Sequence, residues 1–290
     1  NNWSGSGNSG PAEGDSLVFA GTNKLTNTND LATGTSFAGI LFDATAGAFV
    51  LSGNAITLAG SVTNQSTNLQ TINLAVTLGN HITFEVNSAD LVLGGVVSGT
   101  NGLIKSGDHD LLLTAANTYS GGTIIHAGTL ALGANGALGV GSATFASNAT
   151  ISALTNLQIT NLVVIAAGAT GTFQVAPALI QTNTGVISGL GSMVKAGAGT
   201  LQLTAANTYS GGTVIQAGTL VLNRAGNGSG GTISGTIAIH GGTLLLGQAN
   251  QISDDSEVIL SGGKIDTAGF ADRVGRLSVN ADSAITVWAT

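Results

Sequence analysis

The amino-acid sequence predicts an all-β protein and, within that class, a right-handed parallel β-helix (β-solenoid) of roughly a dozen coils. Three observations predict it. One long segment recurs as a close internal copy, short apolar runs follow one another at regular spacing along the whole chain, and the composition is rich in glycine and poor in charge.

The internal copy shows that the chain consists of similar units. Residues 111–132 read LLLTAANTYSGGTIIHAGTLAL and recur at 201–222 as LQLTAANTYSGGTVIQAGTLVL, with 18 of 22 positions identical at an offset of 90 residues. A fixed offset with this degree of identity is typical of repeat proteins, in which each unit packs on its neighbours. We therefore expect the two copies to be built into successive layers of one architecture.

The apolar runs predict strands. They are short, rich in Val, Ile, Thr and Phe, spaced by about 8 to 12 residues, and separated by Gly, Asn, Thr and Ser. Helical periodicity is absent, and glycine recurs too often for helix interiors. In chain order the clearest runs are 38–42, 48–51, 56–58, 72–78, 82–86, 91–93, 123–125, 129–132, 157–165, 243–246, 258–260 and 285–288.

A solenoid accounts for this texture better than a sandwich or a closed barrel, because the same pattern continues over all 290 residues. Each coil of roughly 20 to 25 residues would add two or three short strands and stack its inward Leu, Ile and Val on the coil below. Ninety residues would then correspond to about four coils, with glycine and asparagine turning the corners.

Composition excludes several classes of protein. Charged residues make up 7% of the chain, against roughly 25% in an ordinary soluble domain. With a net charge of −7 and only 7 Lys and Arg, the chain is a poor candidate for binding nucleic acid. It has no cysteine for disulfides or thiolate metal sites, and no apolar stretch near the roughly 20 residues that span a bilayer. We expect no membrane insertion by this segment, and Asn1 in first position suggests a processed product or an excised piece.

The chain is expected to form one body with a short preceding segment. Residues 1–16 contain no strand run and are predicted to be an N-terminal loop or cap, because the end of a solenoid is an open sheet edge. Residues 17–290 are predicted to be a single β-solenoid containing the two close copies, 97–133 and 187–223. Residues 224–235 should form a long corner loop.

Catalytic chemistry has one local candidate. Asp254-Asp255, with His240 before it and Arg273 and Arg276 after it, faintly resembles a polygalacturonase-type site. The histidine precedes the aspartates, however, and Arg273-Val-Gly-Arg276 lacks the lysine of that pattern. We expect these residues at solvated corners, and predict no catalytic residue and no cofactor.

Three other features could bind ligands. Asp108-His109-Asp110 is a charged turn, but adjacent positions point apart, so no metal site is expected. Tyr119 and Tyr209 are the candidates for surface recognition, because their rings could be presented to sugars; the alternative is that each packs against its own corner. Lys105 and Lys195 are expected to lie in solvent at a turn.

The segment GLIKSGDHDLLLTAANTYSGGTIIHAGTLALG (102–133) and its copy MVKAGAGTLQLTAANTYSGGTVIQAGTLVLN (193–223) resemble the autotransporter-associated β-strand repeat, or passenger-associated transport repeat. Both copies keep the lysine (105, 195), Asn-Thr-Tyr (117–119, 207–209), Gly-Gly-Thr (121–123, 211–213) and Ala-Gly-Thr-Leu (127–130, 217–220). The first copy departs at 108–110, where the second carries Ala-Gly-Thr.

The resemblance implies a surface-displayed or secreted β-helical passenger of a Gram-negative-type bacterium, associated with export and folding rather than with a reaction. We therefore expect a non-enzymatic structural or adhesin-like protein, with glycans or other cell-surface components as partners. The alternative is end-to-end stacking of chains into an extracellular filament, for which the apolar run 285–288 could serve. The third hypothesis is a polysaccharide-processing enzyme.

Overall fold

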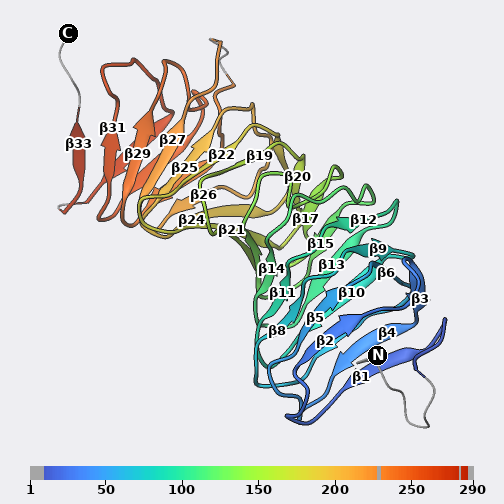
Figure 1. Ribbon diagram of the computed structural model, residues 1–290. Helices are drawn as coiled ribbons and strands as arrows, with labels where there is room; N and C mark the ends of the chain where they lie inside the picture. The colour runs from blue at the N-terminus through green and yellow to red at the C-terminus, as the bar shows by residue number, and fades with distance from the viewer. Residues whose placement is uncertain (1–9, 227–229, 281, 287–290) are drawn as a thin grey trace. The chain divides into compact units, whose positions relative to one another are not determined.

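The computed structural model describes residues 10–226, 230–280 and 282–286. This part of the chain consists of short strands joined by turns, and all the strand pairs considered below are parallel (Figure 1). It divides into two compact units, residues 1–143 and 144–290. The boundary falls between the two copies of the repeat, so each unit contains one.

The first unit is a β-solenoid of six coils with three sheets, drawn blue to green in Figure 1. Sheet A stacks β1 (Ser16–Phe19), β4 (Gly39–Phe42), β7 (Val62–Asn64), β10 (Ile82–Val86), β13 (Leu103–Ser106) and β15 (Thr123–Ile125). Sheet B stacks β2 (Thr26–Asn29), β5 (Val50–Gly53), β8 (Gln70–Ile72), β11 (Leu91–Leu93), β14 (Leu111–Leu113) and β16 (Thr129–Leu132). Sheet C stacks β3 (Thr35–Phe37), β6 (Ile56–Leu58), β9 (Val76–Leu78) and β12 (Val97–Ser98).

The second unit has seven coils, counted along its longest sheet. Its sheet A holds β17 (Ala143–Phe145), which begins at the last residue of the first unit, β20 (Val163–Ile165) and β23 (Ile187–Gly189). Its sheet B stacks β18 (Ala149–Ala153), β21 (Thr170–Val175), β24 (Ser192–Ala196), β26 (Thr213–Ile215), β28 (Thr236–Ile239), β30 (Glu257–Leu260) and β32 (Arg276–Val279). Sheet D stacks β19 (Leu157–Ile159), β22 (Ile180–Asn183), β25 (Thr200–Leu203), β27 (Thr219–Leu222), β29 (Thr243–Leu246), β31 (Lys264–Asp266) and β33 (Ala284–Thr286).

The core is a set of aliphatic columns that run through each unit. Side chains alternate between the two faces of a strand, so every second residue points inward. In sheet B of the first unit, residues in register are Leu51, Ile72, Leu93, Leu113 and Leu132, and each is at most 1% exposed. Burying one such side chain stabilises the fold by roughly 1.5 to 3 kcal/mol.

The coil length follows from the same register. Successive residues of one sheet B column are 19 to 24 positions apart in both units. This agrees with the predicted coil of roughly 20 to 25 residues with two or three strands. The predicted all-β solenoid is confirmed, with about 13 coils in the two units taken together.

The two copies of the repeat do not enter the fold at the same strand position. The lysine strand of the first copy, β13, belongs to sheet A, whereas the lysine strand of the second, β24, belongs to sheet B. The 90-residue offset therefore agrees with the predicted separation of about four coils, but it is not a whole number of coils, so the second copy begins one strand position further along.

The terminal segments are only partly described. Most of the predicted N-terminal cap, residues 1–9, lies outside the described residues, and the first strand begins at Ser16, the last residue assigned to that cap. Residues 224–235 lie between β27 and β28; 227–229 of this corner are not among the described residues. Of the apolar run 285–288, Ile285 and Thr286 are described and belong to β33.

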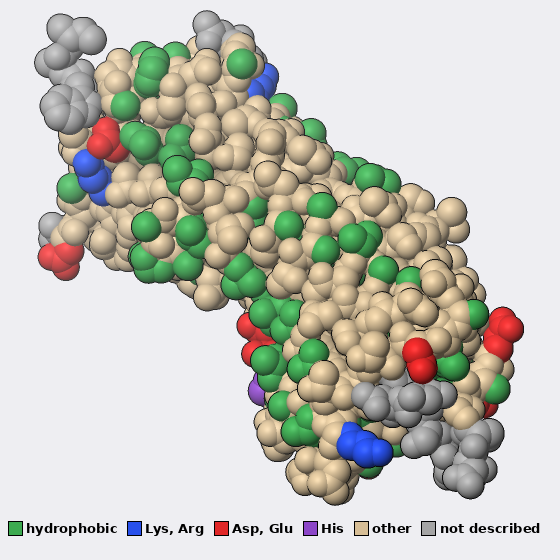
Figure 2. Space-filling view, viewed as in Figure 1, with side chains coloured by type: hydrophobic (Ala, Val, Ile, Leu, Met, Phe, Trp, Pro, Cys, Tyr) green, Lys and Arg blue, Asp and Glu red, His purple; other side chains and the backbone are tan. Residues whose placement is uncertain are grey.

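Neutral groups dominate the surface in view. Figure 2 shows few Lys, Arg, Asp and Glu side chains; most of the surface in view is backbone and other uncharged side chains, with apolar side chains scattered singly and in small groups. Among the described residues no helix is long and apolar enough to cross a membrane.

Candidate functional site

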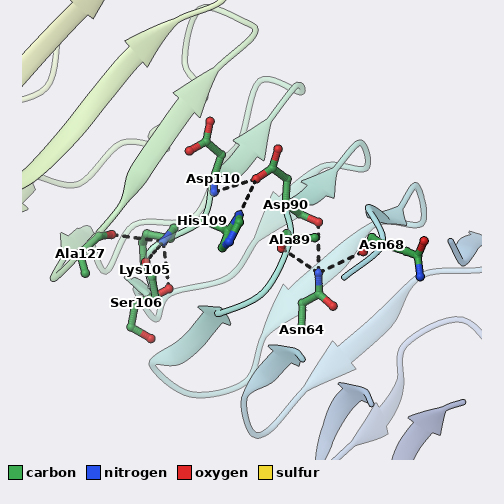
Figure 3. Close-up of polar contacts among 10 residues, drawn as sticks. Asn64, Asn68, Ala89, Asp90, Lys105, Ser106, His109, Asp110 and Ala127 are labelled. Atoms are coloured by element: carbon green, nitrogen blue, oxygen red, sulfur yellow. Dashed lines mark hydrogen bonds and ion pairs between the residues drawn. The ribbon is translucent and has the colours of Figure 1, made fainter. Parts of the chain in front are cut away.

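The most distinctive side-chain site in the first unit is a fully buried lysine. Lys105 shares the inward face of β13 with Leu103 and is in register with Phe84 below and Ile125 above. Its Nζ donates hydrogen bonds to the carbonyl oxygens of Ser106 (2.9 Å), Gly107 (2.6 Å) and Ala127 (3.2 Å), as Figure 3 shows in part.

The second unit repeats this arrangement on different strands. Lys195 of β24 is fully buried between Phe173 and Ile215 in register. Its Nζ donates to the carbonyls of Ala196 (2.8 Å), Gly197 (2.7 Å) and Ala217 (3.1 Å). The acceptors occupy equivalent positions in the two copies, although the lysine strands belong to different sheets. The geometry is therefore a property of the repeat and does not depend on its surroundings.

The expectation that Lys105 and Lys195 lie in solvent is therefore wrong. Strand alternation places both lysines inward, and three backbone carbonyls replace the water that would otherwise solvate each ammonium group. The signal was present in the sequence, since Leu103-Ile104-Lys105 puts the lysine in the same phase as a core leucine. The prediction of exposure depends on the charge alone and does not use this strand phase.

Glycines with positive φ make the carbonyl cage. Gly107 (φ +77°) and Gly197 (φ +74°) each follow the lysine by two positions, in the left-handed region that other residues rarely adopt. A Cβ at either glycine would lie 2.3 Å from a carbonyl oxygen of the preceding coil. The Lys-x-Gly pattern of both copies thus describes one corner: the glycine bends the chain, and the lysine provides a donor for its carbonyl.

Burial also changes the acidity of both ammonium groups. It lowers the pKa of Lys105 and of Lys195 from 10.5 to about 8. Around Lys105 the carboxylates of Asp110, Asp108 and Asp90 act in the opposite direction and favour the charged form. At neutral pH both groups remain mainly ammonium, which is the form that can donate to three acceptors at once.

The two tyrosines form the next part of each repeat. Tyr119 and Tyr209 are at most 1% exposed, and their hydroxyls lie 2.6 Å from the Oγ1 atoms of Thr123 and Thr213. Burial raises the pKa of both phenols. The surface-recognition role expected for Tyr119 and Tyr209 is wrong, because neither ring reaches the surface; each packs inside its own corner.

An asparagine takes the place of a strand at that corner. Asn117 Oδ1 accepts a hydrogen bond from the backbone N–H of Val97 in the preceding coil (2.8 Å), and Nδ2 donates to the carbonyl of Ala137 in the following coil (2.6 Å). Asn207 makes the equivalent bonds to Ile187 N–H (2.8 Å) and Thr232 O (3.1 Å). The amide therefore continues the hydrogen-bond ladder where the backbone turns away.

The candidate catalytic residues are not brought together. His240 follows the carboxyl end of β28, and its Nδ1 lies 2.7 Å from Ser261 Oγ, beyond the carboxyl end of β30. Asp254 and Asp255 precede the amino end of β30. Asp255 and Ser261 are six positions apart in extended chain, or about 20 Å, whereas carboxylates that share a sugar lie roughly 6.5 to 9.5 Å apart.

The arginines of that candidate are also placed apart from the histidine. Arg276 of β32 pairs with Glu257 across the sheet, with Nη1 3.3 Å from Oε1. Arg273 lies in the loop before β32, next to Asp272, whose Oδ2 accepts the backbone N–H groups of Gln251 (2.6 Å) and Ile252. These are corner and cross-strand contacts, as the sequence analysis expected of solvated corners.

The charged turn of the first copy lies at the surface beside the buried lysine (Figure 3). Asp90 Oδ1 accepts the N–H of Asp110 (3.1 Å) and lies 3.6 Å from His109 Nδ1. Nearby, Asn64 Nδ2 donates to the carbonyl of Ala89 at 2.8 Å. In the described part of the chain no three His, Cys, Asp or Glu side chains are grouped so that they could hold a metal ion.

Comparison with known proteins identifies the repeats. The model of the passenger-associated-transport-repeat family matches residues 103–132 and 193–222, which are the segments that hold the two buried lysines. The chain therefore carries two passenger-associated transport repeats, and the resemblance seen in the sequence is confirmed.

A longer relative covers more of the chain. In an alignment of 199 positions that covers 64% of this chain, the chain is 33% identical to the adhesin BmaC autotransporter of Brucella suis biovar 1 (strain 1330). The chain spans only 5% of the length of that relative. No solved structure matches the chain.

Proposed function

We propose that this chain is part of the passenger of an autotransporter-type protein and that, displayed outside a Gram-negative cell, it acts as a non-enzymatic, adhesin-like structural segment. One observation carries the proposal. The chemically distinctive side chains of the repeats, Lys105, Lys195, Tyr119 and Tyr209, are all buried and bonded within the fold. Their role is to build the solenoid, which leaves the neutral exterior to make contacts.

The comparisons support this assignment. The matched repeat is named for passenger transport, and the relative with 33% identity is described as an adhesin autotransporter. A solenoid also suits export, because each coil contacts only its neighbours and can fold in sequence as the chain emerges.

The exterior suggests the chemistry of a partner. In sheet C, the outward residues Ser36, Thr57, Thr77 and Ser98 lie in register, one in each coil, and the hydroxyls of Thr77 and Ser98 are 3.2 Å apart. Hydroxyl and amide groups both donate and accept hydrogen bonds, as sugar hydroxyls do. We therefore favour glycans or other cell-surface components as partners of this surface.

Display and adhesion test the proposal directly. The 290-residue chain would be fused to a surface-display scaffold in a non-adherent bacterium, with the scaffold alone as the matched control. We expect the displayed chain to increase attachment to host-cell monolayers or to an immobilised glycan array. Attachment equal to that of the scaffold alone on every surface would contradict the adhesin role.

The non-enzymatic part has its own test. Purified chain would be incubated with neutral and acidic polysaccharides, and new reducing ends would be measured. We expect none, because His240 follows the carboxyl end of β28 and Asp255 precedes the amino end of the neighbouring strand β30. Turnover that is lost in an Asp254→Asn/Asp255→Asn variant would overturn this part.

A further inference from the structure

The buried lysine joins two windings of the same repeat. Lys105 Nζ bonds two carbonyls of its own coil and a third, that of Ala127, 22 residues later in the next coil. Lys195 does the same with Ala217, also 22 residues later. Both partners of each long bond fall inside the matched repeat, 103–132 or 193–222.

Two glycines close the same corner from the other side. Gly128 and Gly218 follow the accepting alanines and have φ of +66° and +68°. A Cβ on Gly218 would lie 2.3 Å from the carbonyl oxygen of Gly199 and 2.4 Å from that of Gly197, which itself accepts from Lys195. The two windings therefore approach closely at the point where the ammonium bonds both.

The bonds of the lysine are directional. On its N-terminal side Lys195 is in register with Phe173, an apolar residue of the preceding coil. On its C-terminal side it donates to Ala217 O. If the second winding were absent, the ammonium would lose one of its three acceptors and the strand that packs over it. A buried charge with an unsatisfied donor is more costly than a missing apolar contact.

Asparagine extends the closed pair to the coils on either side. Asn207 accepts from Ile187 N–H, which precedes the second repeat, and donates to Thr232 O, which follows it. Lysine thus closes the repeat on itself, whereas asparagine connects the repeat to coils outside it.

We infer that the buried lysine is a latch that makes each repeat a two-winding cooperative unit, in which the first winding is stable only when the second is docked. The inference rests on the contacts within the repeat and deepens the proposed role of these repeats in building an exported passenger. In a solenoid whose coils otherwise interact through similar apolar columns, such units would order before the coils between them.

Native-state hydrogen exchange of the full chain, followed by mass spectrometry, tests the latch. The variant is Lys195→Met, which keeps an unbranched side chain and removes the charge and all three donors. We expect the backbone amides of 193–222 to exchange roughly tenfold faster as one block, in both windings, with 103–132 unchanged. The reciprocal Lys105→Met variant should affect 103–132 and leave 193–222 unchanged.

Phe173→Leu is the matched control, because it weakens the core on the other side of Lys195. It should speed exchange in β21 as well as in the block 193–222, whereas Lys195→Met should leave β21 unchanged. If Lys195→Met speeds exchange only at 195–197 and leaves 213–222 protected, the windings are not coupled through the lysine and the inference is wrong.

A variant that fails to fold does not leave the question open. Lys195→Gln retains two amide donors on a shorter side chain, and is expected to give an intermediate rate over the same block. A Lys195→Gln protein with wild-type exchange throughout would also refute the latch. None of these readouts depends on adhesion, so failure of the latch and failure of the proposed function are distinguishable.

Discussion

The pH dependence of stability gives the sharpest test of the buried lysines. Burial lowers the pKa of Lys105 and Lys195 to about 8 in the folded protein, whereas in the unfolded chain both return to about 10.5. Between these values the unfolded state binds more protons than the folded state. The free energy of unfolding must therefore rise with pH in this window, and the benefit is lost as the pH falls through 8.

The size of the effect follows from the shift. Each pKa unit is worth about 1.4 kcal/mol, so the full benefit is about 3 kcal/mol per lysine above pH 10.5. At pH 9.5 it amounts to about 2 kcal/mol per lysine, or about 4 kcal/mol for the two. The tyrosines limit the range, because burial raises the pKa of Tyr119 and Tyr209. Above about pH 10 only the unfolded phenols ionise, which lowers stability again.

The assay is denaturant unfolding followed by circular dichroism at pH 7.5, 8.5 and 9.5, for the wild type and for Lys105→Met/Lys195→Met. The wild type should gain stability over this range and the double variant should stay flat. At pH 7.5 the variant should be less stable than the wild type, because six buried carbonyls lose a hydrogen-bond donor. Each unsatisfied carbonyl costs about 1 to 3 kcal/mol, and part of this loss is offset because the variant no longer buries two charges. Parallel pH profiles of the two proteins would refute the assignment of both ammonium groups to the carbonyl cages.

Three further predictions concern the same corners. In a spectrophotometric titration the folded protein should show no phenolate absorbance near pH 10, and ionisation of Tyr119 and Tyr209, the only two tyrosines, should appear together with unfolding; an ordinary titration of either would contradict its burial. Gly218→Ala should destabilise by more than about 1 kcal/mol beyond Gly168→Ala, measured by denaturant midpoint, because both glycines have positive φ but only at Gly218 would a Cβ meet backbone atoms within 4 Å. In a Lys195→Met background, Asp110→Asn should make the rise in unfolding free energy begin at lower pH, because the Asp110 carboxylate raises the pKa of Lys105. An unchanged pH profile would show that this carboxylate does not act on Lys105.

Much of the fold could be predicted because strands of a solenoid are short and apolar. The predicted runs 56–58, 82–86, 91–93, 123–125 and 129–132 coincide with strands of the first unit. Two of the predicted runs are divided in the structure. Residues 72–78 split between β8 and β9, and 157–165 between β19 and β20. Corner residues such as Leu74 are also buried, so hydrophobicity does not fall where the chain turns.

The candidate site is harder to predict, because residue type is a poor indicator of location in this fold. A lysine or tyrosine beside glycines ordinarily suggests an exposed turn, since charged groups are rarely buried unless paired. In this fold the pairing partners are backbone carbonyls that only the corner geometry directs inward. No property of Lys105 or Lys195 alone reveals those acceptors, although strand phase gives the direction of each side chain.

The same geometry explains why several separate motifs recur together in the repeat. A winding that turns through a left-handed glycine leaves carbonyl groups pointing into the interior, and such groups need a donor. A lysine two residues earlier lies in phase with the apolar column, and its ammonium group brings three donors to that corner. Twenty-two residues later, Ala-Gly supplies the third carbonyl and the second left-handed turn. Lys-x-Gly and Ala-Gly-Thr are therefore two halves of one corner, and a solenoid sequence that keeps one half without the other should leave either a buried charge or a buried carbonyl without a partner.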